Sequence, residues 1–256
     1  MKRLLILTTC LFALIISCKD TKQKTALDVH KPLDKKEIHT ISNGHLQVVI
    51  KTKGAELTSI KADTLEYLWQ GNPKVWNRQS PILFPIVGRL KDHEYIYNGK
   101  TYPMKQHGFA RDNGFKVVEK TETSITFEQI ATEESKKIYP FDFVLQVKYT
   151  LNGKSLQTEY RVQNPSASED LYFSIGAHPA FNCPFKENQK RNEYQLVFDE
   201  KIAPKFQTNV NGLYEGNTHD ILKEKGIMDL PDTIFDHGSL ALNPNVFSKV
   251  TFVHKP

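Results

Sequence analysis

The sequence predicts an all-β protein in which antiparallel strands form a sandwich. Three observations support this expectation: apolar and polar residues alternate in many short segments, Asn-Gly pairs separate some of these segments, and helical patterns are nearly absent. Alternation with a period of two residues is typical of strands with one buried and one solvated face. Many such strands at short spacing indicate a β-sandwich or a β-barrel.

Length and composition fit a globular protein and argue against several functional classes. The chain has 256 residues, 39% of them hydrophobic and 25% charged, which is enough to bury a sizeable core. Its formal net charge is +5, without the concentrated basic stripe that is typical of nucleic-acid-binding proteins. The sequence has no Gly-rich phosphate loop and no alternation of strands with helices, which argues against dinucleotide and P-loop chemistry.

The first residues have the pattern of a lipoprotein signal peptide, expected over residues 1–17. A positive start precedes the apolar stretch Leu4 to Ile16, which suits a signal peptide and is short for a permanent membrane span. The stretch ends in Ile15-Ile16-Ser17-Cys18, which resembles a bacterial lipobox. The resemblance implies cleavage before Cys18 and attachment of lipid to that residue, with ordinary secretion as the alternative.

The polar residues 18–36 are expected to form a disordered tether that begins with the lipidated Cys18. We therefore expect a protein of the cell envelope, anchored to a membrane through lipid on the periplasmic side or at the surface. Because Cys10 would leave with the signal peptide, Cys183 would be the one free thiol, and no intrachain disulfide is expected.

Residues 37–256 are expected to form one β-domain. Its first strands share the alternation of apolar and polar residues and are separated by short turns. They are His45–Ile50, Leu57–Ile60, Glu94–Tyr97, Lys100–Tyr102, Phe115–Val118 and Ser124–Phe127. Asn98-Gly99 separates the third of these strands from the fourth, and a helical turn is expected at Glu133 to Lys137.

The clearest hairpin is expected between Phe141 and Gln163. Apolar residues occupy alternate positions in both halves, and Asn152-Gly153 lies between the halves. An Asn-Gly pair suits the positive φ angles at the two central positions of a tight turn. The last expected strand lies within Ser248 to Pro256.

Three stretches fit neither plain strands nor plain turns and are the candidate functional segments. They are Pro81 to Arg89 (PILFPIVGR), Gln106 to Arg111 (QHGFAR) and Ser174 to Phe181 (SIGAHPAF). The second and third each place a histidine, His107 or His178, beside glycine or proline and a phenylalanine. Glycine allows close backbone approach, proline fixes the local path, and an aromatic ring offers a surface on which a sugar ring stacks.

The same residues argue against some other chemistries. His107 and His178 do not have the spacing of metal ligands, so no metal site is expected. The sequence has no GxSxG elbow, and Cys183 lacks the signature of a catalytic nucleophile. Each histidine taken singly also fits a hydrogen-bonded core or turn residue.

In this order within an all-β chain, PILFPIVGR, QHGFAR and GAHPAF resemble the aldose 1-epimerase (galactose mutarotase-like) family, above all its LacX-like branch. NGHLQVVIKTKGAELTSIK and KIYPFDF also resemble segments of that family. The resemblance implies a large, twisted antiparallel β-supersandwich with a sugar site on one concave face. It also implies interconversion of the α and β anomers of a free aldose, without a cofactor.

Carried over residue by residue, the resemblance implies roles for three side chains. His178 matches the general acid, which protonates the ring oxygen while a base removes the proton from the anomeric hydroxyl. His107 matches the histidine that hydrogen-bonds the sugar near the reacting oxygen, and Arg89 matches the arginine that reaches its hydroxyls. Further substrate contacts are expected from Phe109, Phe181 and Asp236.

One part of the family pattern has no match in this sequence. The family's general base is a glutamate in a stretch resembling PFVCIEPW, which follows a stretch resembling FPYLGIW, and neither occurs here. Either the sequence is a piece of a longer gene product, or the chain is whole and lacks the base. Loss of several strands would leave sheet edges and apolar faces uncovered, which favours the first explanation.

Two other functions remain open. One is a non-catalytic sugar-binding lipoprotein that keeps both histidines without the base. The other is a hexose-6-phosphate 1-epimerase, in which Arg78, Arg89 and Arg111 would bind the phosphate. The expected partners are therefore a small sugar and a membrane, with no nucleic acid and with the oligomeric state open.

Overall fold

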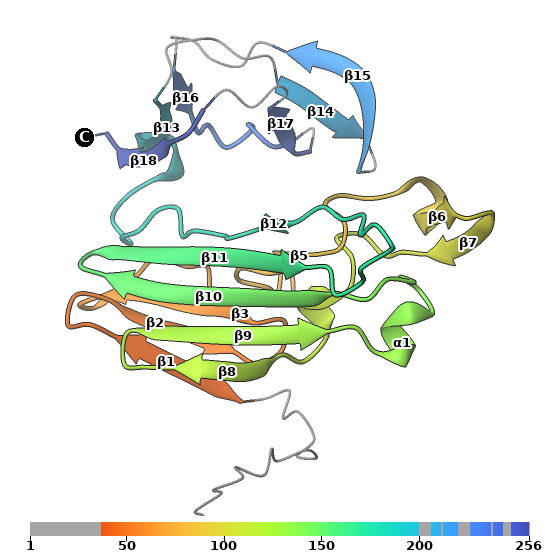
Figure 1. Ribbon diagram of the computed structural model, residues 1–256. Coiled ribbons are helices and arrows are strands. Elements are labelled where there is room, and N and C mark those ends of the chain that lie inside the picture. The colour runs from red at the N-terminus through yellow and green to blue at the C-terminus, as the bar shows by residue number, and fades with distance from the viewer. Residues whose placement is uncertain are drawn as a thin grey trace, which may run out of the picture. The chain divides into compact units, whose positions relative to one another are not determined.

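A computed structural model describes residues 37–199, 206–210, 212–219, 226–236, 238–242 and 247–255, and Figure 1 shows its elements. The expected signal peptide, the lipidated Cys18 and the tether to residue 36 lie outside the described residues. Strands dominate the described ranges, and helical structure is confined to a few short turns. None of the described helices has the length and apolar character needed to cross a membrane.

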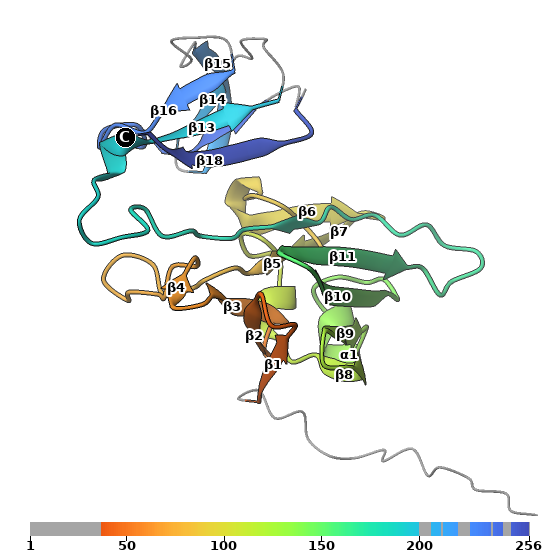
Figure 2. The same ribbon diagram turned by 90° about the vertical axis from the view of Figure 1, so that its left-hand side faces the viewer.

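Two four-stranded antiparallel sheets form the larger part of the structure. The first has the order β1-β2-β3-β4, and the second has the order β11-β10-β9-β8. Their strands are β1 (Ile38–Ser42), β2 (Gln47–Lys51), β3 (Glu56–Ala62), β4 (Leu65–Glu66), β8 (Lys116–Lys120), β9 (Ser124–Ile130), β10 (Val144–Asn152) and β11 (Ser155–Gln163). Figure 2 shows the two sheets as separate layers.

The main hydrophobic core lies between these layers. Buried side chains of β2, such as Val48 and Ile50, belong to one cluster with Phe127 of β9 and Val147 of β10. The alternation that predicted the strands places these residues on the inner faces, where burial of apolar surface stabilises the fold. The expectation of an antiparallel sandwich is therefore confirmed for this part of the chain.

The two predicted tight turns differ in outcome. Asn98 and Gly99 have φ angles of 49° and 74° and join β6 (Glu94–Tyr97) to β7 (Lys100–Pro103), as expected. In the second hairpin Asn152 pairs with Ser155, so the turn residues are Gly153 and Lys154, and the predicted position is wrong by one residue. The helical turn is confirmed as α1 (Glu133–Lys136), whose start is capped by Thr132 and Ser135.

Two very short strands and three 3₁₀ turns connect the sheets to the candidate segments. β5 (Ile82–Leu83) pairs with β12 (Gly176–Ala177) in an antiparallel ladder of two residues. The 3₁₀ turns are η1 (Lys91–His93), η2 (Ala110–Asp112) and η3 (Arg191–Glu193). The β5–β12 pairing joins two of the three candidate functional stretches.

The C-terminal third forms two three-stranded sheets of its own, with the orders β16-β13-β18 and β15-β14-β17. The strands are β13 (Tyr194–Phe198), β14 (Phe206–Val210), β15 (Leu213–His219), β16 (Ile227–Asp229), β17 (Leu240–Leu242) and β18 (Val250–His254). A second cluster of buried residues, including Tyr194, Phe198 and Met228, packs in this region. Of these strands, the sequence predicted only β18.

Candidate active site

The structure brings the two candidate histidines together. The ring centroids of His107 and His178 lie 5.6 Å apart, with the planes at 60°. The two residues come from separate candidate stretches, far apart in the sequence. This proximity distinguishes the pair from two unrelated turn histidines and makes it the centre of the candidate site.

His178 is held by Pro81, the residue that directly precedes β5. Its backbone N–H donates a hydrogen bond of 3.1 Å to the Pro81 carbonyl, immediately after the β5–β12 ladder. The ring of Trp76 lies 5.2 Å from the imidazole, between centroids. The backbone of His178 is therefore fixed, and its imidazole has an aromatic neighbour on one side.

His107 is held in a backbone conformation that is uncommon for a residue with a side chain. Its φ is 65°, in the left-handed region, where histidine is more frequent than most residues. Its N–H donates to the Gly88 carbonyl at 2.8 Å, and its Nδ1 accepts from the Gly88 N–H at 3.0 Å. These two hydrogen bonds fix both the backbone and the ring of His107.

Gly108 allows the histidine loop, residues 106–111, to approach the stretch 81–88 closely. A Cβ at this position would lie 2.1 Å from the carbonyl oxygen of Phe84, and the φ of Gly108 is +69°. The next two residues, Phe109 and Ala110, both donate their N–H groups to that same oxygen, at 3.0 and 3.1 Å. Glycine at this position is therefore required by the contact itself.

Burial and positive charge act on both imidazoles. Burial, followed by the positive charge of Arg111 and by His178, lowers the pKa of His107 to about 4. The pKa of His178 is also lowered, first by loss of solvent contact and then by Arg111. Because Nδ1 of neutral His107 accepts from Gly88, its proton is assigned to Nε2, which is free to act as a hydrogen-bond donor.

The neighbouring arginines already have partners in the protein. Arg78 donates from Nη2 to Oδ1 of Asp112 at 2.7 Å, and Arg111 donates from Nη2 to the Gln106 carbonyl at 2.7 Å. Arg89 follows Gly88 directly and is partly buried. Arg111, which belongs to the QHGFAR motif, supplies the positive charge next to the imidazoles.

The three other expected substrate contacts lie in different surroundings. Phe109 is 8% exposed and packs against Phe84, Tyr139 and Phe143, so the core encloses the ring that was expected to face a sugar. Asp236 is exposed at the end of the turn that begins at Pro231. Because other rings enclose Phe109, it offers little open face, and its role as a substrate contact stays a prediction.

Phe181 is 50% exposed and lines an open cavity of about 710 Å³. The cavity lies beside the turn from β1 to β2 and the hairpin of β10 and β11. Its other lining residues are Gly44, His45, Leu46, Ile60, Ala62, Asp63, Tyr67, Lys154 and Leu156. Neither candidate histidine lines this cavity.

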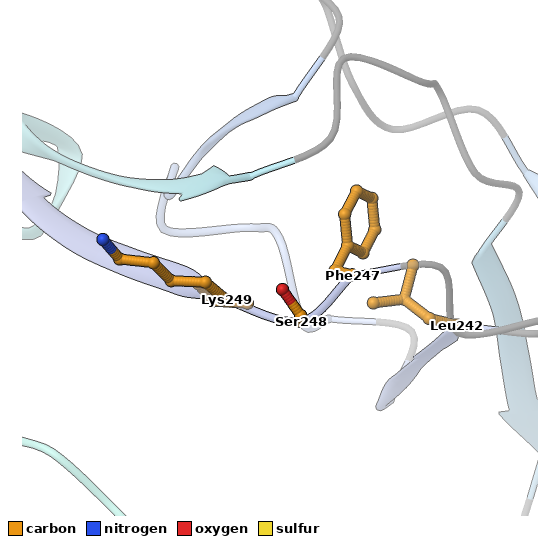
Figure 3. A pocket seen from close by; sticks show the side chains of 5 residues that line it. Leu242, Phe247, Ser248 and Lys249 are labelled. Atoms are coloured by element: carbon orange, nitrogen blue, oxygen red, sulfur yellow. The ribbon is translucent and has the colours of Figure 1, made fainter.

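A second cavity, of about 410 Å³, lies in the C-terminal region. It is lined by Leu242, Phe247, Ser248, Lys249 and Val250. Figure 3 shows Phe247 close to Leu242, whereas the side chain of Lys249 points away from them. No residue predicted from the sequence as part of the site lines this cavity.

The described part of the chain contains no carboxylate that contacts either imidazole of the pair. Within the same ranges, no group of three or more His, Cys, Asp and Glu side chains is arranged to hold a metal ion. Sequence reasoning missed Trp76 as a neighbour of His178, because a tryptophan in a polar segment gives no signal of its own. The chemistry that these residues support is proton transfer at His178 beside a neutral hydrogen-bond donor, Nε2–H of His107.

Comparisons with known proteins identify the family of this chain. The model of the family described as aldose 1-epimerase matches residues 37–211. The plasmid and chromosomal forms of protein LacX from Lactococcus lactis subsp. lactis are each 40% identical to this chain over 212 residues, which cover 79% of this chain and 71% of LacX.

Solved structures show the same similarity. A galactose mutarotase related enzyme from Lactobacillus acidophilus has a TM-score of 0.79 and 35% identity, covering 85% of this chain and 73% of its own. A galactose mutarotase-like protein from Lactobacillus casei has a TM-score of 0.78 and 34% identity, covering 85% of this chain and 76% of its own. The predominantly β fold of this chain therefore matches that of galactose mutarotase-like proteins.

Proposed function

Because the chain belongs to the aldose 1-epimerase family, we propose that it interconverts the α and β anomers of a free aldose by acid–base ring opening. The observation that carries the proposal is the pairing of His107 and His178, with ring centroids 5.6 Å apart. Family membership supports a sugar epimerase kind of function, and the pair offers His178 as an acid beside His107 as a neutral hydrogen-bond donor.

In the proposed reaction, protonated His178 donates a proton to the ring oxygen as the bond from that oxygen to C1 breaks. A base removes the proton of the anomeric hydroxyl, the C1–C2 bond rotates, and the ring closes on either face of the carbonyl. The positive charge of Arg111 lowers the pKa of His178 and so makes its proton easier to transfer. Closure returns the proton to His178.

His107 has a different part in this proposal. Its Nδ1 is occupied by the Gly88 N–H, so the neutral ring presents Nε2–H to the sugar as a hydrogen-bond donor. A neutral donor stabilises negative charge that develops on the sugar oxygen without competing for its proton. Arg89 is proposed to bind the sugar hydroxyls. The role of base is not assigned to a described residue.

The test is the rate of anomer exchange. NMR exchange spectroscopy on equilibrated glucose or galactose measures the rate with and without the protein. We expect acceleration by the wild type and a loss of about 10²- to 10⁴-fold in kcat for His178→Gln. Equal rates for the wild type and the variant would show that His178 is not the acid.

A second candidate function is sugar binding without catalysis. The observation that favours it is that, among the described residues, no carboxylate contacts either imidazole. This candidate predicts heat of sugar binding in calorimetry without faster anomer exchange in the same sample. The hexose-6-phosphate alternative gains no such support, since Arg78 and Arg111 donate to protein groups, and strong inhibition by glucose 6-phosphate would be needed to favour it.

We also propose that the protein is a lipoprotein of the cell envelope. The support is the sequence alone: an apolar signal segment that ends in Ile-Ile-Ser-Cys, with Cys18 as the lipid acceptor. Mass spectrometry of the mature N-terminus from the native host tests this proposal. Diacylglycerol on Cys18 would support it, and an unmodified Cys18 would contradict it.

A further inference from the structure

Glu56, at the start of β3, is a fully buried carboxylate that the proposed chemistry does not use. Its exposed fraction is 0%. Oε1 accepts hydrogen bonds from two consecutive backbone N–H groups, those of Gln79 at 2.9 Å and Ser80 at 3.2 Å. Oε2 lies 2.7 Å from Nζ of Lys51, the residue opposite Glu56 on β2. Burying a carboxylate is costly, so these partners define a built site.

The segment that Glu56 holds is the segment that holds His178. The Pro81 carbonyl accepts from the His178 N–H at 3.1 Å, and the Gln79 carbonyl accepts from the Ala180 N–H at 2.8 Å. Pro179, between these two residues, has no N–H to donate. Both backbone hydrogen bonds that flank the imidazole therefore depend on the position of residues 79–81.

Alternative partners for the Gln79 and Ser80 amides would have to come from water or from a shift of the chain. Both N–H groups point at one oxygen, and Ser80 is itself 7% exposed. Hydrogen bonds to a charged acceptor are stronger than neutral ones, and loss of the acceptor leaves one buried donor, Ser80, and one part-buried donor, Gln79, unsatisfied. The segment would then be free to shift relative to β3.

We propose that Glu56 is a positioning residue, which fixes the backbone of His178 through the Gln79–Pro81 segment. It touches neither imidazole and acts in two steps: its Oε1 holds the Gln79 and Ser80 amides, and the Gln79 and Pro81 carbonyls hold the Ala180 and His178 amides. The proposal rests on the proposed function for its effect on catalysis. Its structural part, the immobilisation of His178, does not depend on that function.

Hydrogen–deuterium exchange in the full-length chain, followed by NMR, tests the structural part. We expect Glu56→Ala to accelerate exchange at the His178 and Ala180 amides by about tenfold or more, because the common acceptor of the Gln79 and Ser80 amides is lost. Glu56→Gln retains an oxygen for both amides and should remain within about threefold of the wild type. Unchanged exchange at His178 in Glu56→Ala would overturn the proposal.

The comparison with Glu56→Gln separates hydrogen bonding from charge. The carboxylate also acts on Arg111, whose pKa is lowered by burial and Arg78 and is raised by Asp112 and Glu56. If Glu56→Gln accelerates exchange at His178 as much as Glu56→Ala, charge rather than hydrogen bonding holds the segment, and the proposal is overturned. If Glu56→Ala does not fold, Glu56→Asp provides the test. Aspartate keeps the charge, but its shorter side chain moves the carboxylate oxygen away from the Gln79 and Ser80 amides. Exchange at the His178 amide as slow as in the wild type would then overturn the proposal.

Tyr149→Phe is the matched control for lost stability. The buried Tyr149 hydroxyl donates to the carbonyl of Ala55, the residue before Glu56, at 2.9 Å. Removal of this hydroxyl should lower the stability of the same core. The rate of exchange at the His178 amide, corrected for the lower global stability, should stay unchanged. An equal local effect in this control would show that any nearby destabilisation releases His178, which overturns a specific role for Glu56.

Anomer exchange then tests the catalytic consequence. We expect Glu56→Ala to lower kcat by about tenfold or more with KM nearly unchanged, and Glu56→Gln to restore most of the rate. If the wild type shows no acceleration, the proposed function fails while the exchange of the His178 amide still decides the positioning role. If the wild type is active and Glu56→Ala keeps its kcat, the positioning role is refuted and the proposed function stands.

Discussion

Gly88 and His107 exchange two hydrogen bonds, one between their backbones and one from the Gly88 N–H to the imidazole Nδ1 at 3.0 Å. The second bond requires an unprotonated Nδ1, which assigns the proton of the neutral ring to Nε2. A backbone group thus selects the tautomer of this candidate side chain. The same two hydrogen bonds tie the loop that contains His107 to the stretch Pro81–Gly88.

Replacing His107 with asparagine should separate the role of this residue in folding from its role in sugar binding. Asparagine adopts the left-handed conformation readily, and its side-chain oxygen replaces Nδ1 as the acceptor. We expect His107→Asn to fold with stability close to the wild type, whereas His107→Ala loses about 2 kcal/mol from the lost hydrogen bond and the unfavourable φ.

Both substitutions at His107 remove Nε2–H, so both should weaken sugar binding. Thermal unfolding and calorimetric titration with galactose or glucose measure the two effects separately. Wild-type affinity in His107→Asn would show that the imidazole does not contact the sugar.

Gly108→Ala should disrupt the contact between the histidine loop and Phe84. The added Cβ would meet three backbone atoms of Phe84 and Pro85 within 2.6 Å, and no side-chain rotation relieves such a clash. Gly99→Ala is the matched control, since Gly99 has a similar φ of +74° with nothing within 4 Å. We expect Gly108→Ala to cost at least about 2 kcal/mol more than the control, measured by denaturant unfolding. Similar losses would show that only the φ angle matters.

Activity should have its maximum in mildly acidic solution. His178 must be protonated, and its pKa lies below the ordinary value of 6.5, so kcat/KM should fall as the pH rises through that pKa. His107 must be neutral, and its pKa is about 4, so activity should also fall as the pH drops through this value. A pH–rate profile between about 3 and 8 measures both limbs. An alkaline limb with its midpoint above 6.5 would contradict the expected environment of His178.

Arg111→Met should shift the alkaline limb of this profile to higher pH. The positive charge of Arg111 lowers the pKa of both histidines, so its removal raises both values. Arg78→Met is the matched control, because Arg78 lowers the pKa of Arg111 and is not among the groups that shift either histidine. NMR titration of the imidazole resonances measures these shifts directly. A downward shift in Arg111→Met would refute the electrostatic assignment.

Alternation of apolar residues predicted the strands of the sandwich well but not the register of the β10–β11 hairpin. With Asn152-Gly153 in the turn, Tyr149 would face Leu156, whereas in the structure Leu151 faces Leu156. Both registers place Leu156 opposite an inward-facing residue, so the apolar pattern does not distinguish them. The turn uses a single positive φ at Gly153, which requires no asparagine.

In the site, too, the sequence predicted the residues that belong to local motifs but not the contacts between segments that are distant in the sequence. The motifs identified His107 and His178, but the burial of Phe109 depends on contacts with Phe84, Tyr139 and Phe143, which come from other parts of the chain. Glu56 directly precedes the predicted strand Leu57–Ile60, and nothing in the local sequence indicates that two distant amides converge on it. The C-terminal strand β14 (FQTNV) lacks a clear alternation, and sequence reasoning therefore missed it.

The stretch from Pro81 to Gly88 contacts both histidine segments through its backbone: Pro81 binds His178, and Gly88 binds His107. The spacing of the two imidazoles is thus encoded in the length of one continuous piece of chain. An insertion or deletion within these residues would alter that spacing directly, whereas a change of length in the surface hairpins would leave it intact. For protein engineering, the length of this stretch should be kept constant, and new sequence should be inserted in the surface hairpins.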